Sequence, residues 1–291
     1  MALEIVPLSP GIGAEIRGVR LNRISDADFR TIYATWLDRQ VLVVRDQQFT
    51  IEEFLAYSAR FGIPTPHVIK RTRHPEYPAL TVMGGAPIVY REGTPQEATL
   101  KRGEGWHTDT AFLPVPAKAT QLYALEIPSF GGDTLFASMY AAYDALPGDL
   151  KTRLETMQAV FCCDGKNKAS NRLMDEEERQ RPPVRHPIVR VHPETGRKSL
   201  YINPVHTLAM AGMDAEEGDA LLDDLYARMV QPGFEYRHQW RVGDVVIWDN
   251  RCTIHSATGG YPLSERRVHW RTTIMARDPD GASAGRSAAQ S

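Results

Sequence analysis

Short runs of strand-forming residues, separated by turn residues, recur along most of the chain and restrict the folds that it can adopt. Residues 41–44, Val-Leu-Val-Val, form a continuous aliphatic run that is typical of a strand buried on both faces. The other predicted strands are residues 3–6, 14–19, 79–83, 119–127, 134–137, 186–191, 199–203, 234–240, 244–248 and 267–275. Many short strands with turn signals and few helices favour a double-sheet jelly roll over a parallel α/β sheet.

A few helices interrupt the predicted strands, and capping residues mark where they begin. Ser25 precedes an apolar stripe at helical spacing, and Thr50 opens a capping box for a second helix. Two further helices are predicted at residues 147–157 and from Asp214 onward. We therefore expect a mainly β fold with flanking helices, of the α+β class, in which residues 1–277 form a single domain built as a double-stranded β-helix, that is, a distorted jelly roll.

Three segments break this pattern. Residues 84–105 contain several glycines and prolines and show little periodicity, and residues 165–185 are polar and charged. A long irregular segment inside a domain is more often a functional lid than an idle loop, so we predict lid segments near 84–105 and 165–185. The Gly/Ala/Ser-rich composition of residues 278–291 predicts a disordered tail.

Charge, cysteine content and hydropathy exclude several classes of function. The net charge of −2 gives no electrostatic basis for binding nucleic acid or an anionic membrane. Three cysteines, two of them adjacent, do not make a disulfide framework, which favours a reducing cytoplasm. No apolar run approaches the roughly 18 residues of a membrane span, and residues 1–7 lack the pattern of a signal peptide. We expect a soluble cytoplasmic protein whose partner is a small molecule.

A His-x-Asp pair, His107 and Asp109, says most about chemistry. On an extended segment, residues two apart point to the same face, so the imidazole and the carboxylate can bind one metal ion together. His255 is the best candidate for a third ligand. Two histidines and one carboxylate, with open positions opposite, are the ligand set of non-haem Fe(II) oxygenases. By itself a His-x-Asp pair is frequent by chance and more often belongs to a surface loop, so other residues must decide.

Two arginines follow the candidate ligands on a predicted strand. Alternation over residues 267–274 places Arg267, His269 and Arg271 on one face of that strand. The two guanidinium groups, about 13 Å apart along the strand, can hold two separate carboxylates or similar anions by bidentate pairing. Without the candidate metal ligands, the same arginines would be interpreted as exposed charges on an edge strand.

Several short motifs carry a family resemblance. They are Trp106-His107-Thr108-Asp109, Gly131-Gly132-Asp133-Thr134, His192-Pro193-x-Thr195-Gly196, Trp248-Asp249-Asn250-Arg251 and the opening Pro7-Leu8-x-Pro10-x-Ile12-Gly13-Ala14. In wording and spacing the chain resembles the taurine dioxygenase/2,4-dichlorophenoxyacetate dioxygenase (TauD/TfdA) family of Fe(II)- and 2-oxoglutarate-dependent oxygenases. The resemblance extends over residues 3–277, and it implies the jelly-roll core that the strand pattern also favours.

The resemblance implies cofactors and roles for individual residues. His107, Asp109 and His255 would be the catalytic residues that bind Fe(II). The co-substrate 2-oxoglutarate would chelate the iron through its C1 carboxylate and keto oxygen, while Thr134 and Arg267 hold its distal carboxylate. With O₂, the reaction converts 2-oxoglutarate to succinate and CO₂ and hydroxylates the prime substrate. Because halogenating relatives lack the carboxylate, the presence of Asp109 argues for hydroxylation.

The resemblance also suggests a substrate pocket. Arg271 would face the acid group of the prime substrate, and His67 and Phe112 would line the pocket. Lys70 and His206 stand where the taurine enzymes have aromatic pocket residues, which predicts a more polar pocket. We therefore expect a small anionic substrate, namely a sulfonate, sulfate, phosphonate or carboxylate. An aryloxyalkanoate-type dioxygenase of the same family is the alternative, and relatives suggest a homo-oligomer.

Two readings from other functional classes compete with the dioxygenase. A zinc hydrolase could use the same two histidines and carboxylate to activate water, but this hypothesis leaves Thr134 and Arg267 without a role. A metal-free binding protein on a degenerate jelly roll would not require the three candidate ligands together with both arginines. Formation of succinate from 2-oxoglutarate separates all three hypotheses.

Overall fold

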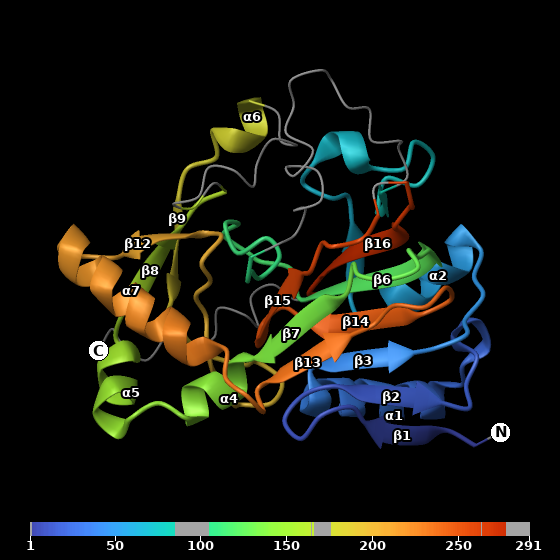
Figure 1. The fold of residues 1–291 in the computed structure, drawn as a ribbon, viewed down its shortest axis with the longest axis horizontal. Coiled ribbons are helices and arrows are strands. Elements are labelled where there is room, and N and C mark those ends of the chain that lie inside the picture. The colour runs from blue at the N-terminus through green and yellow to red at the C-terminus, as the bar shows by residue number, and fades with distance from the viewer. Residues whose placement is uncertain (1, 85–104, 164, 166–175, 263, 278–291) are drawn as a thin grey trace.

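The computed structural model describes residues 2–84, 105–163, 165, 176–262 and 264–277 of the chain. Within these ranges a large sheet dominates the fold (Figure 1). Its strands follow the order β1 (Glu4–Pro7), β2 (Ala14–Arg17), β3 (Val41–Val44), β14 (Val245–Asp249), β6 (Ala119–Glu126), β16 (Val268–Met275) and β4 (Ile63–Thr65), with β5 (Leu80–Met83) also paired to β16. All neighbours are antiparallel except β2 and β3, which are parallel.

Smaller sheets complete the strand content of the described ranges. A three-stranded sheet contains β13 (Glu235–His238), β7 (Thr134–Ser138) and β15 (Thr253–Ala257). The remaining strands are β12 (Thr207–Met210), β8 (Gln158–Phe161) and β9 (Val184–Pro187) in one sheet, and β10 (Val189–Val191) with β11 (Lys198–Leu200) in another. The helices are η1 (Leu21–Arg23), α1 (Asp26–Arg39), α2 (Ile51–Ala59), η2 (Lys70–Thr72), α4 (Met139–Asp144), α5 (Gly148–Leu154), α6 (Glu176–Arg179) and α7 (Ala215–Met229).

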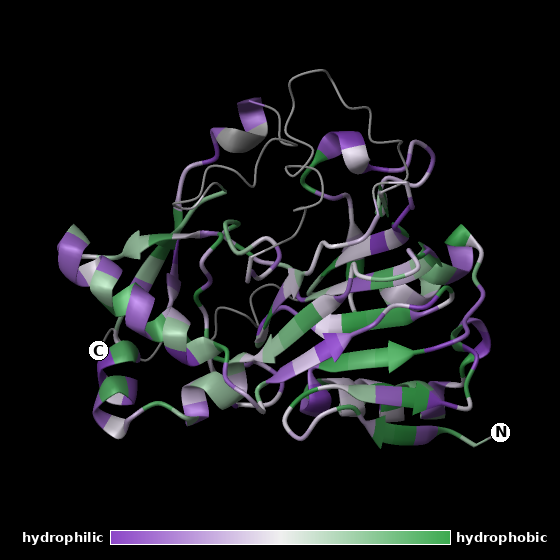
Figure 2. Cartoon of the chain, in the orientation of Figure 1, coloured by the Kyte–Doolittle hydropathy of each residue, from purple (hydrophilic) through white to green (hydrophobic). Residues whose placement is uncertain are grey.

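The large sheet is buried on both faces at β3, which explains the uninterrupted aliphatic run in this strand. Leu42 and Val44 pack into one core cluster with side chains of α1 and α2, including Trp36. Val41 and Val43 pack on the other face, in a second cluster that also contains Phe136 of the β13-β7-β15 sheet. Figure 2 shows β3 as hydrophobic along its length, as expected for a strand covered from both sides.

The two long N-terminal helices begin where their capping residues predict. The Ser25 side chain accepts a hydrogen bond from the Asp28 amide at the start of α1. Thr50 and Glu53 make a reciprocal capping box at the start of α2. Helix α1 ends at Gln40, which adopts a left-handed conformation (φ 66°) before β3 begins. The starts of both helices are set by local capping residues and were predictable for that reason.

The predicted mainly β jelly roll with flanking helices is confirmed. Several elements were not predicted, among them the strands β4, β8, β12 and β15 and the short helices α4 and α6. Strand β15 is the segment that carries His255, and its neighbours Asn250 and Arg251 hide its strand pattern. Helix α4 has only six residues, too few for helical periodicity to show.

The predicted lids and tail fall mostly on residues that the structure does not describe. Of the segment 84–105, only Gly84 and Gly105 are described, and the predicted tail 278–291 lies outside the described residues. Of the segment 165–185, the described part is Gly165 and residues 176–185, which include α6 and the start of β9. The lid predictions therefore stay predictions. Among the described helices, none has the length and apolar character needed to cross a bilayer.

Candidate metal centre

His107 and His255 meet through a short β-bridge between segments that are far apart in the sequence. Each residue donates its amide N–H to the carbonyl of the other over 2.9 Å. A doubly hydrogen-bonded antiparallel pair of this kind sets two side chains beside each other, and the two imidazole centroids lie 4.2 Å apart. Pairing of β15 with β7 sets His255 opposite Phe136, whose ring stacks on it. The sheet therefore fixes the direction of His255.

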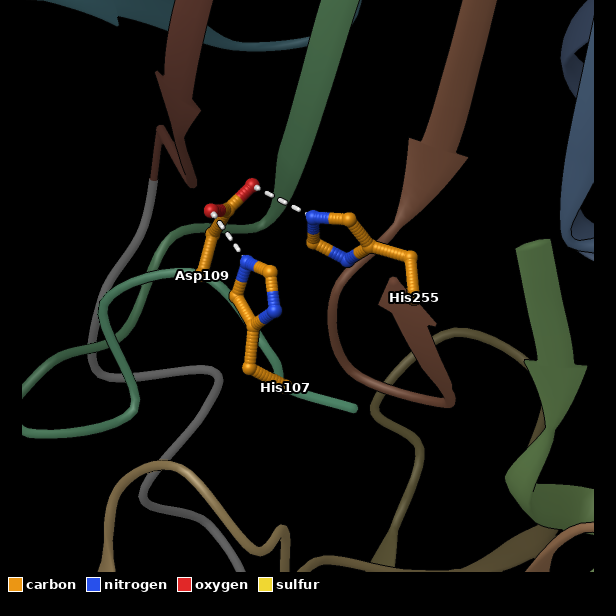
Figure 3. Close-up of side chains that lie close together, drawn as sticks. All are labelled: His107, Asp109 and His255. Atoms are coloured by element: carbon orange, nitrogen blue, oxygen red, sulfur yellow. Dashed lines mark ion pairs between the residues drawn. The ribbon is translucent and has the colours of Figure 1, made fainter. Parts of the chain in front are cut away.

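Asp109 completes a cluster in which each imidazole faces one oxygen of the same carboxylate (Figure 3). His107 Nε2 lies 3.9 Å from Asp109 Oδ1, and His255 Nε2 lies 3.8 Å from Oδ2. His107 Nδ1 is 2.8 Å from the Gly105 carbonyl oxygen. Because a carbonyl only accepts, Nδ1 carries the proton and Nε2 presents its lone pair to the cluster. The structure thus brings together all three predicted metal ligands.

The Asp109 carboxylate is oriented by a buried chain of hydrogen bonds from three different segments. The Thr120 hydroxyl donates to Asp109 Oδ2 over 2.6 Å. Asn250 Nδ2 donates to Thr120 Oγ1 over 3.0 Å, and Trp248 Nε1 donates to Asn250 Oδ1 over 2.9 Å. Outer partners of this kind fix the orientation of metal-binding side chains and tune their basicity.

Arg271 reaches the same carboxylate from β16. Its Nη2 lies 2.7 Å from Asp109 Oδ1. The sequence predicted that Arg271 would face the acid group of the substrate, and the structure shows that it already has an anionic partner within the protein. Burial opposes ionisation of Asp109, but Arg271, His255 and His107 together outweigh it and hold the pKa of this carboxyl well below its usual range. The aspartate is consequently a carboxylate, able to bind a cation, across the physiological pH range.

The three side chains fit a divalent transition metal. Each offers one ligand atom, and these atoms lie within 4.8 Å of one another. Burial, assisted by His107, lowers the pKa of His255 well below its usual value, so this imidazole is neutral. Neutral imidazole and ionised carboxylate are the forms that bind metals. A set of three protein ligands leaves coordination positions free, as catalytic rather than structural sites do.

A second group of possible ligands, His192, Asp249 and Cys252, is already saturated by protein contacts. Asp249 Oδ1 accepts from the backbone amide and Nε of Arg251 at 2.9 and 2.8 Å. Its Oδ2 accepts from Arg251 Nη2 at 2.6 Å and faces His192 Nε2 at 3.0 Å. Because a carboxylate has about four lone-pair positions, we interpret this group as a structural charge network.

Arg267 lies beside Thr134, with its side chain partly buried. Arg267 Nε donates to the Gly132 carbonyl over 2.8 Å, and its Nη2 lies 3.4 Å from Thr134 Oγ1. Burial lowers the pKa of Arg267 to about 10, which still leaves the guanidinium charged at neutral pH. Within the described ranges it makes no ion pair, so the charge is available to an incoming anion.

The Thr134 hydroxyl is prepared to donate to the same anion. Trp240 Nε1 donates to Thr134 Oγ1 over 3.0 Å, and Arg267 Nη2 lies 3.4 Å from the same oxygen. An indole N–H and a guanidinium have no acceptor, so the hydroxyl proton of Thr134 must point elsewhere. Arg267 and Thr134, the two predicted carboxylate-binding residues, therefore converge as one donor pair.

Gly132 is required for this convergence. It has φ 68°, and a Cβ at this position would come within 2.9 Å of the Arg267 side chain at Cδ. Any larger residue would combine a strained left-handed backbone with a clash against the arginine. The second glycine of the Gly131-Gly132 motif is thus required by the close approach of the Arg267 side chain.

His67 lies close to Arg271 on the approach to the three ligands. Its Nδ1 accepts from the Ile69 amide over 3.2 Å, so the ring proton is on Nε2. Burial, and next Arg271, lower the pKa of His67 to about 3. His67 is therefore a neutral hydrogen-bond donor beside a cation, a combination suited to an acid group.

His206 and Phe112 form a wall next to His107. The ring centroids of His206 and His107 are 6.2 Å apart, and Phe112 packs edge-on against His206 at 4.9 Å. His206 Nδ1 faces the Cys163 carbonyl at 3.1 Å, and burial lowers the pKa of this histidine to about 4. The apolar side chains around Phe112 are Val68, Ile69, Leu113 and Cys163.

Lys70 is placed differently from the other predicted pocket residues. It lies on η2, and its half-exposed side chain makes an ion pair with Glu177 of α6 at 2.7 Å. The structure thus groups His67, Phe112, His206 and Arg271 around the three ligands and directs Lys70 toward α6. A role for Lys70 in substrate binding stays a prediction.

Sequence reasoning missed the residues that hold the others in place. Thr120, Asn250 and Trp240 contact functional side chains that are remote in sequence, so no local pattern announces their roles. For Asn250 the Trp248-Asp249-Asn250-Arg251 motif was a signal, since its polar residues interrupt an otherwise buried apolar strand. Thr120 and Trp240 gave no comparable signal.

The chain is similar to known proteins along nearly its whole length. Residues 4–273 match the family model described as "Taurine catabolism dioxygenase TauD, TfdA family". The chain is 37% identical to the (S)-phenoxypropionate/alpha-ketoglutarate-dioxygenase of Sphingobium herbicidovorans, over 96% of both chains. It is 32% identical to the alpha-ketoglutarate-dependent 2,4-dichlorophenoxyacetate dioxygenase of Cupriavidus pinatubonensis, over 94% of this chain and 98% of that protein.

A solved structure provides a comparison with ligands bound. The crystal structure of AAD-2 in complex with Mn(II) and N-oxalylglycine matches this fold with a TM-score of 0.78 at 30% identity, covering 96% of this chain and 99% of that chain.

Proposed function

The chain belongs to the TauD, TfdA family of 2-oxoglutarate-dependent dioxygenases, which use Fe(II) and O₂, and we propose that its iron is held by His107, Asp109 and His255. The observation that carries this assignment is the convergence of these three side chains on one point, with the tautomer of His107 fixed by the Gly105 carbonyl. Iron supplies the activation of O₂, which side chains cannot perform. The protein positions both substrates and excludes water.

Arg267 and Thr134 are proposed to bind the distal carboxylate of 2-oxoglutarate. Support comes from the partly buried Arg267 guanidinium, which makes no ion pair in the described part of the chain, and from the Thr134 hydroxyl, whose proton is free to donate. A carboxylate between these groups would receive charge-assisted hydrogen bonds and neutralise a buried cation. Conversion of 2-oxoglutarate to succinate and CO₂ then accompanies hydroxylation of the prime substrate.

The prime substrate is a small anionic organic molecule, and Arg271 with His67 is the proposed site for its acid group. Arg271 contacts Asp109, and the neutral His67, whose pKa is affected by both Arg271 and Asp109, has an Nε2–H that can serve as a second donor. An acid group held there would place the neighbouring C–H bonds next to the three ligands. Orientation of this kind can contribute about 7–11 kcal/mol to lowering a barrier.

Among anionic substrates, we propose an aryloxyalkanoic acid. Phe112 and the apolar side chains around it form an apolar wall. This wall adjoins His206, whose ring lies next to the ligand His107. An aromatic body would bury its surface against this wall, while a short sulfonate such as taurine would leave it uncovered. The names of the two relatives above, on phenoxypropionate and 2,4-dichlorophenoxyacetate, support the same class.

A substrate panel tests this proposal. Succinate formation is measured with Fe(II), ascorbate, O₂ and 2-oxoglutarate in the presence of both enantiomers of an aryloxypropionate, an aryloxyacetate, taurine and an alkyl sulfate. We expect aryloxyalkanoates to give the highest kcat/KM. Faster turnover of taurine or the alkyl sulfate would assign the pocket to sulfonates or sulfates instead. If no succinate formed with any of these substrates, or with 2-oxoglutarate alone, the dioxygenase assignment itself would be contradicted.

The three cysteines form no disulfide in the structure, and Cys162 is half-buried while the other two are buried. Free thiols persist in reducing compartments, which supports the proposal that the protein works in the cytoplasm.

A further inference from the structure

His269 is a fully buried imidazole, and neither of its ring nitrogens has a hydrogen-bond partner among the residues that the structure describes. A buried polar group that lacks its partner costs about 1–3 kcal/mol. An aliphatic side chain would avoid this cost at the same position. The unpaired nitrogens therefore indicate that a polar group is bound next to His269 when the protein functions.

Strand β16 directs His269 toward the interior that contains the metal centre. The neighbouring Thr272 points the other way, since its hydroxyl lies 3.0 Å from that of Ser58 on α2. Arg271 points inward, because it reaches Asp109. His269 lies two residues before Arg271 on the same strand and so shares its face.

The ring of Trp240 joins His269 to the pocket proposed for the distal carboxylate. The centroids of Trp240 and His269 lie 4.5 Å apart in an edge-to-face arrangement. The Arg267 guanidinium lies 5.7 Å from the centroid of the same indole, and the indole N–H donates to Thr134. One aromatic ring is thus in contact with all three polar side chains of the pocket.

The protonation state of His269 suits a donor rather than a second cation. Burial, and next the charges of Arg267 and His238, lower the pKa of His269 well below its usual value. A neutral imidazole has one N–H donor and one acceptor nitrogen. Beside a cationic guanidinium, it can add a hydrogen bond to an anion without adding repulsion to Arg267.

We propose that His269 donates a hydrogen bond to the distal carboxylate of 2-oxoglutarate, as a third donor beside Arg267 and Thr134. This inference rests on the proposed function, since it presumes that these two residues bind that carboxylate. It makes His269 a co-substrate-binding residue, with a contribution to affinity that depends on the distal acid group.

Ligand binding without turnover tests the inference. Protein loaded with Mn(II) is titrated calorimetrically, in the absence of O₂, with 2-oxoglutarate and with pyruvate, which has the same 2-oxo acid group but no distal carboxylate. For His269→Leu we expect 2-oxoglutarate to bind at least about tenfold more weakly, the loss typical of one hydrogen bond to a charged group. Pyruvate should bind as it does to the wild type.

Two variants with an amide side chain at position 269 restore a hydrogen-bond donor, at two different distances from the backbone. His269→Asn and His269→Gln place an N–H near the positions of Nδ1 and Nε2, and one of them should recover most of the affinity for 2-oxoglutarate. Thermal unfolding confirms that each variant is folded, and His74→Leu, in a turn between η2 and β5, is the matched histidine control.

Unchanged binding of 2-oxoglutarate to His269→Leu would overturn the inference. So would an equal loss for pyruvate, or failure of both folded amide variants to recover affinity, since each would indicate a role in packing or at the C1 carboxylate. Failure of the proposed function looks different, because the wild type would then not bind 2-oxoglutarate or Arg267→Ala would bind it normally.

Discussion

At the scale of single residues, each side chain of the metal centre is oriented by a contact outside the centre. His107 is fixed by the Gly105 carbonyl, Asp109 by Thr120, and His255 by pairing of β15 with β7 and by the stacked ring of Phe136. The protein therefore offers a site whose ligands need little rearrangement to bind a metal. Such preorganisation keeps the entropic cost of metal binding low.

Removal of one imidazole should abolish metal retention. For His255→Ala we expect no stoichiometric Fe(II) or Mn(II) after desalting and no succinate formation, because two protein ligands rarely hold a labile divalent ion. Metal content by elemental analysis provides the measurement. His74→Ala is the control and should retain one metal ion per chain. Full metal occupancy and turnover in His255→Ala would show that His255 is not a ligand.

Truncation of Arg267 should act on 2-oxoglutarate specifically. Removing one partner of a buried charge pair typically costs about 3–5 kcal/mol, so Arg267→Ala should raise the KM for 2-oxoglutarate by at least two orders of magnitude, at about 1.4 kcal/mol per tenfold. Arg266→Ala is a matched control, because the adjacent Arg266 is half-exposed and pairs with Glu126 at the surface. If the KM were unchanged and only the prime substrate were affected, another residue would bind the distal carboxylate.

Arg271→Ala should separate the two substrates. We expect binding of 2-oxoglutarate, followed by the metal-to-ligand absorption band of the Fe(II) complex, to persist while substrate-triggered turnover is lost. Because Arg271 also contacts Asp109, retained metal content must be verified in the variant. Wild-type turnover by Arg271→Ala, together with efficient use of a neutral substrate, would contradict the proposed role.

The sequence identifies the residues that do chemistry better than the residues that support them. His107, Asp109, His255, Arg267 and Thr134 lie in short motifs with local patterns, and the structure groups the first three and pairs the last two. The contact between Arg271 and Asp109 was not predictable, since it depends on how β16 passes the 107–109 segment in three dimensions.

At the scale of elements, local chemistry explains what was predictable. Helix α2 begins at a capping box, and β3 is a continuous aliphatic run, so neither depends on distant contacts for its recognition. Strand β15 was missed because its place is decided by pairing with β7, over a hundred residues earlier in the chain. Long-range pairing leaves little trace in the local sequence of a five-residue strand.

The capping box of α2 gives a prediction at this scale. Thr50→Ala removes the side-chain acceptor of the Glu53 amide, and we expect a loss of about 0.5–2 kcal/mol in the free energy of unfolding. Urea unfolding followed by circular dichroism measures it. Thr31→Ala, an exposed threonine inside α1, should change stability by less. Helix α2 contacts β16 through Ser58, which lies in its last turn and bonds to Thr272. Fraying of the first turn does not reach this contact, so we expect 2-oxoglutarate binding to stay intact.

At the scale of the whole molecule, one charge network connects the helical layer with the sheets. Glu194, in the turn between β10 and β11, accepts from the Tyr33 hydroxyl of α1 at 2.6 Å and pairs with Lys118 at 3.0 Å and with Arg251 at 2.5 Å. Arg251 in turn holds Asp249 at the end of β14. Four segments that are distant in sequence are thereby fixed relative to one another, beside the strand that leads to Asn250.

This network gives the stability of the protein a predictable dependence on pH. Burial would raise the pKa of Glu194, but hydrogen bonds from Tyr33 and Arg251 outweigh it and lower the pKa to about 2 from its ordinary value of 4.5. Because the pKa is lower in the folded state, the carboxylate stabilises the fold above about pH 4.5 and loses this effect as the pH falls toward 2. Allowing for solvent screening of its partly exposed side chain, its contribution at pH 7 is about 2 kcal/mol.

Glu194→Gln should reveal this contribution as a difference that depends on pH. We expect the variant to unfold at lower urea concentration than the wild type at pH 7, and the gap in unfolding free energy to shrink steadily between pH 4.5 and the lowest pH at which the wild type is still folded. Glu76→Gln, at an exposed position, should show neither effect. A gap of constant size over the same pH range would mean that Glu194 stabilises the fold through shape and hydrogen bonding rather than through its charge, and the ion pairs with Lys118 and Arg251 would then contribute little.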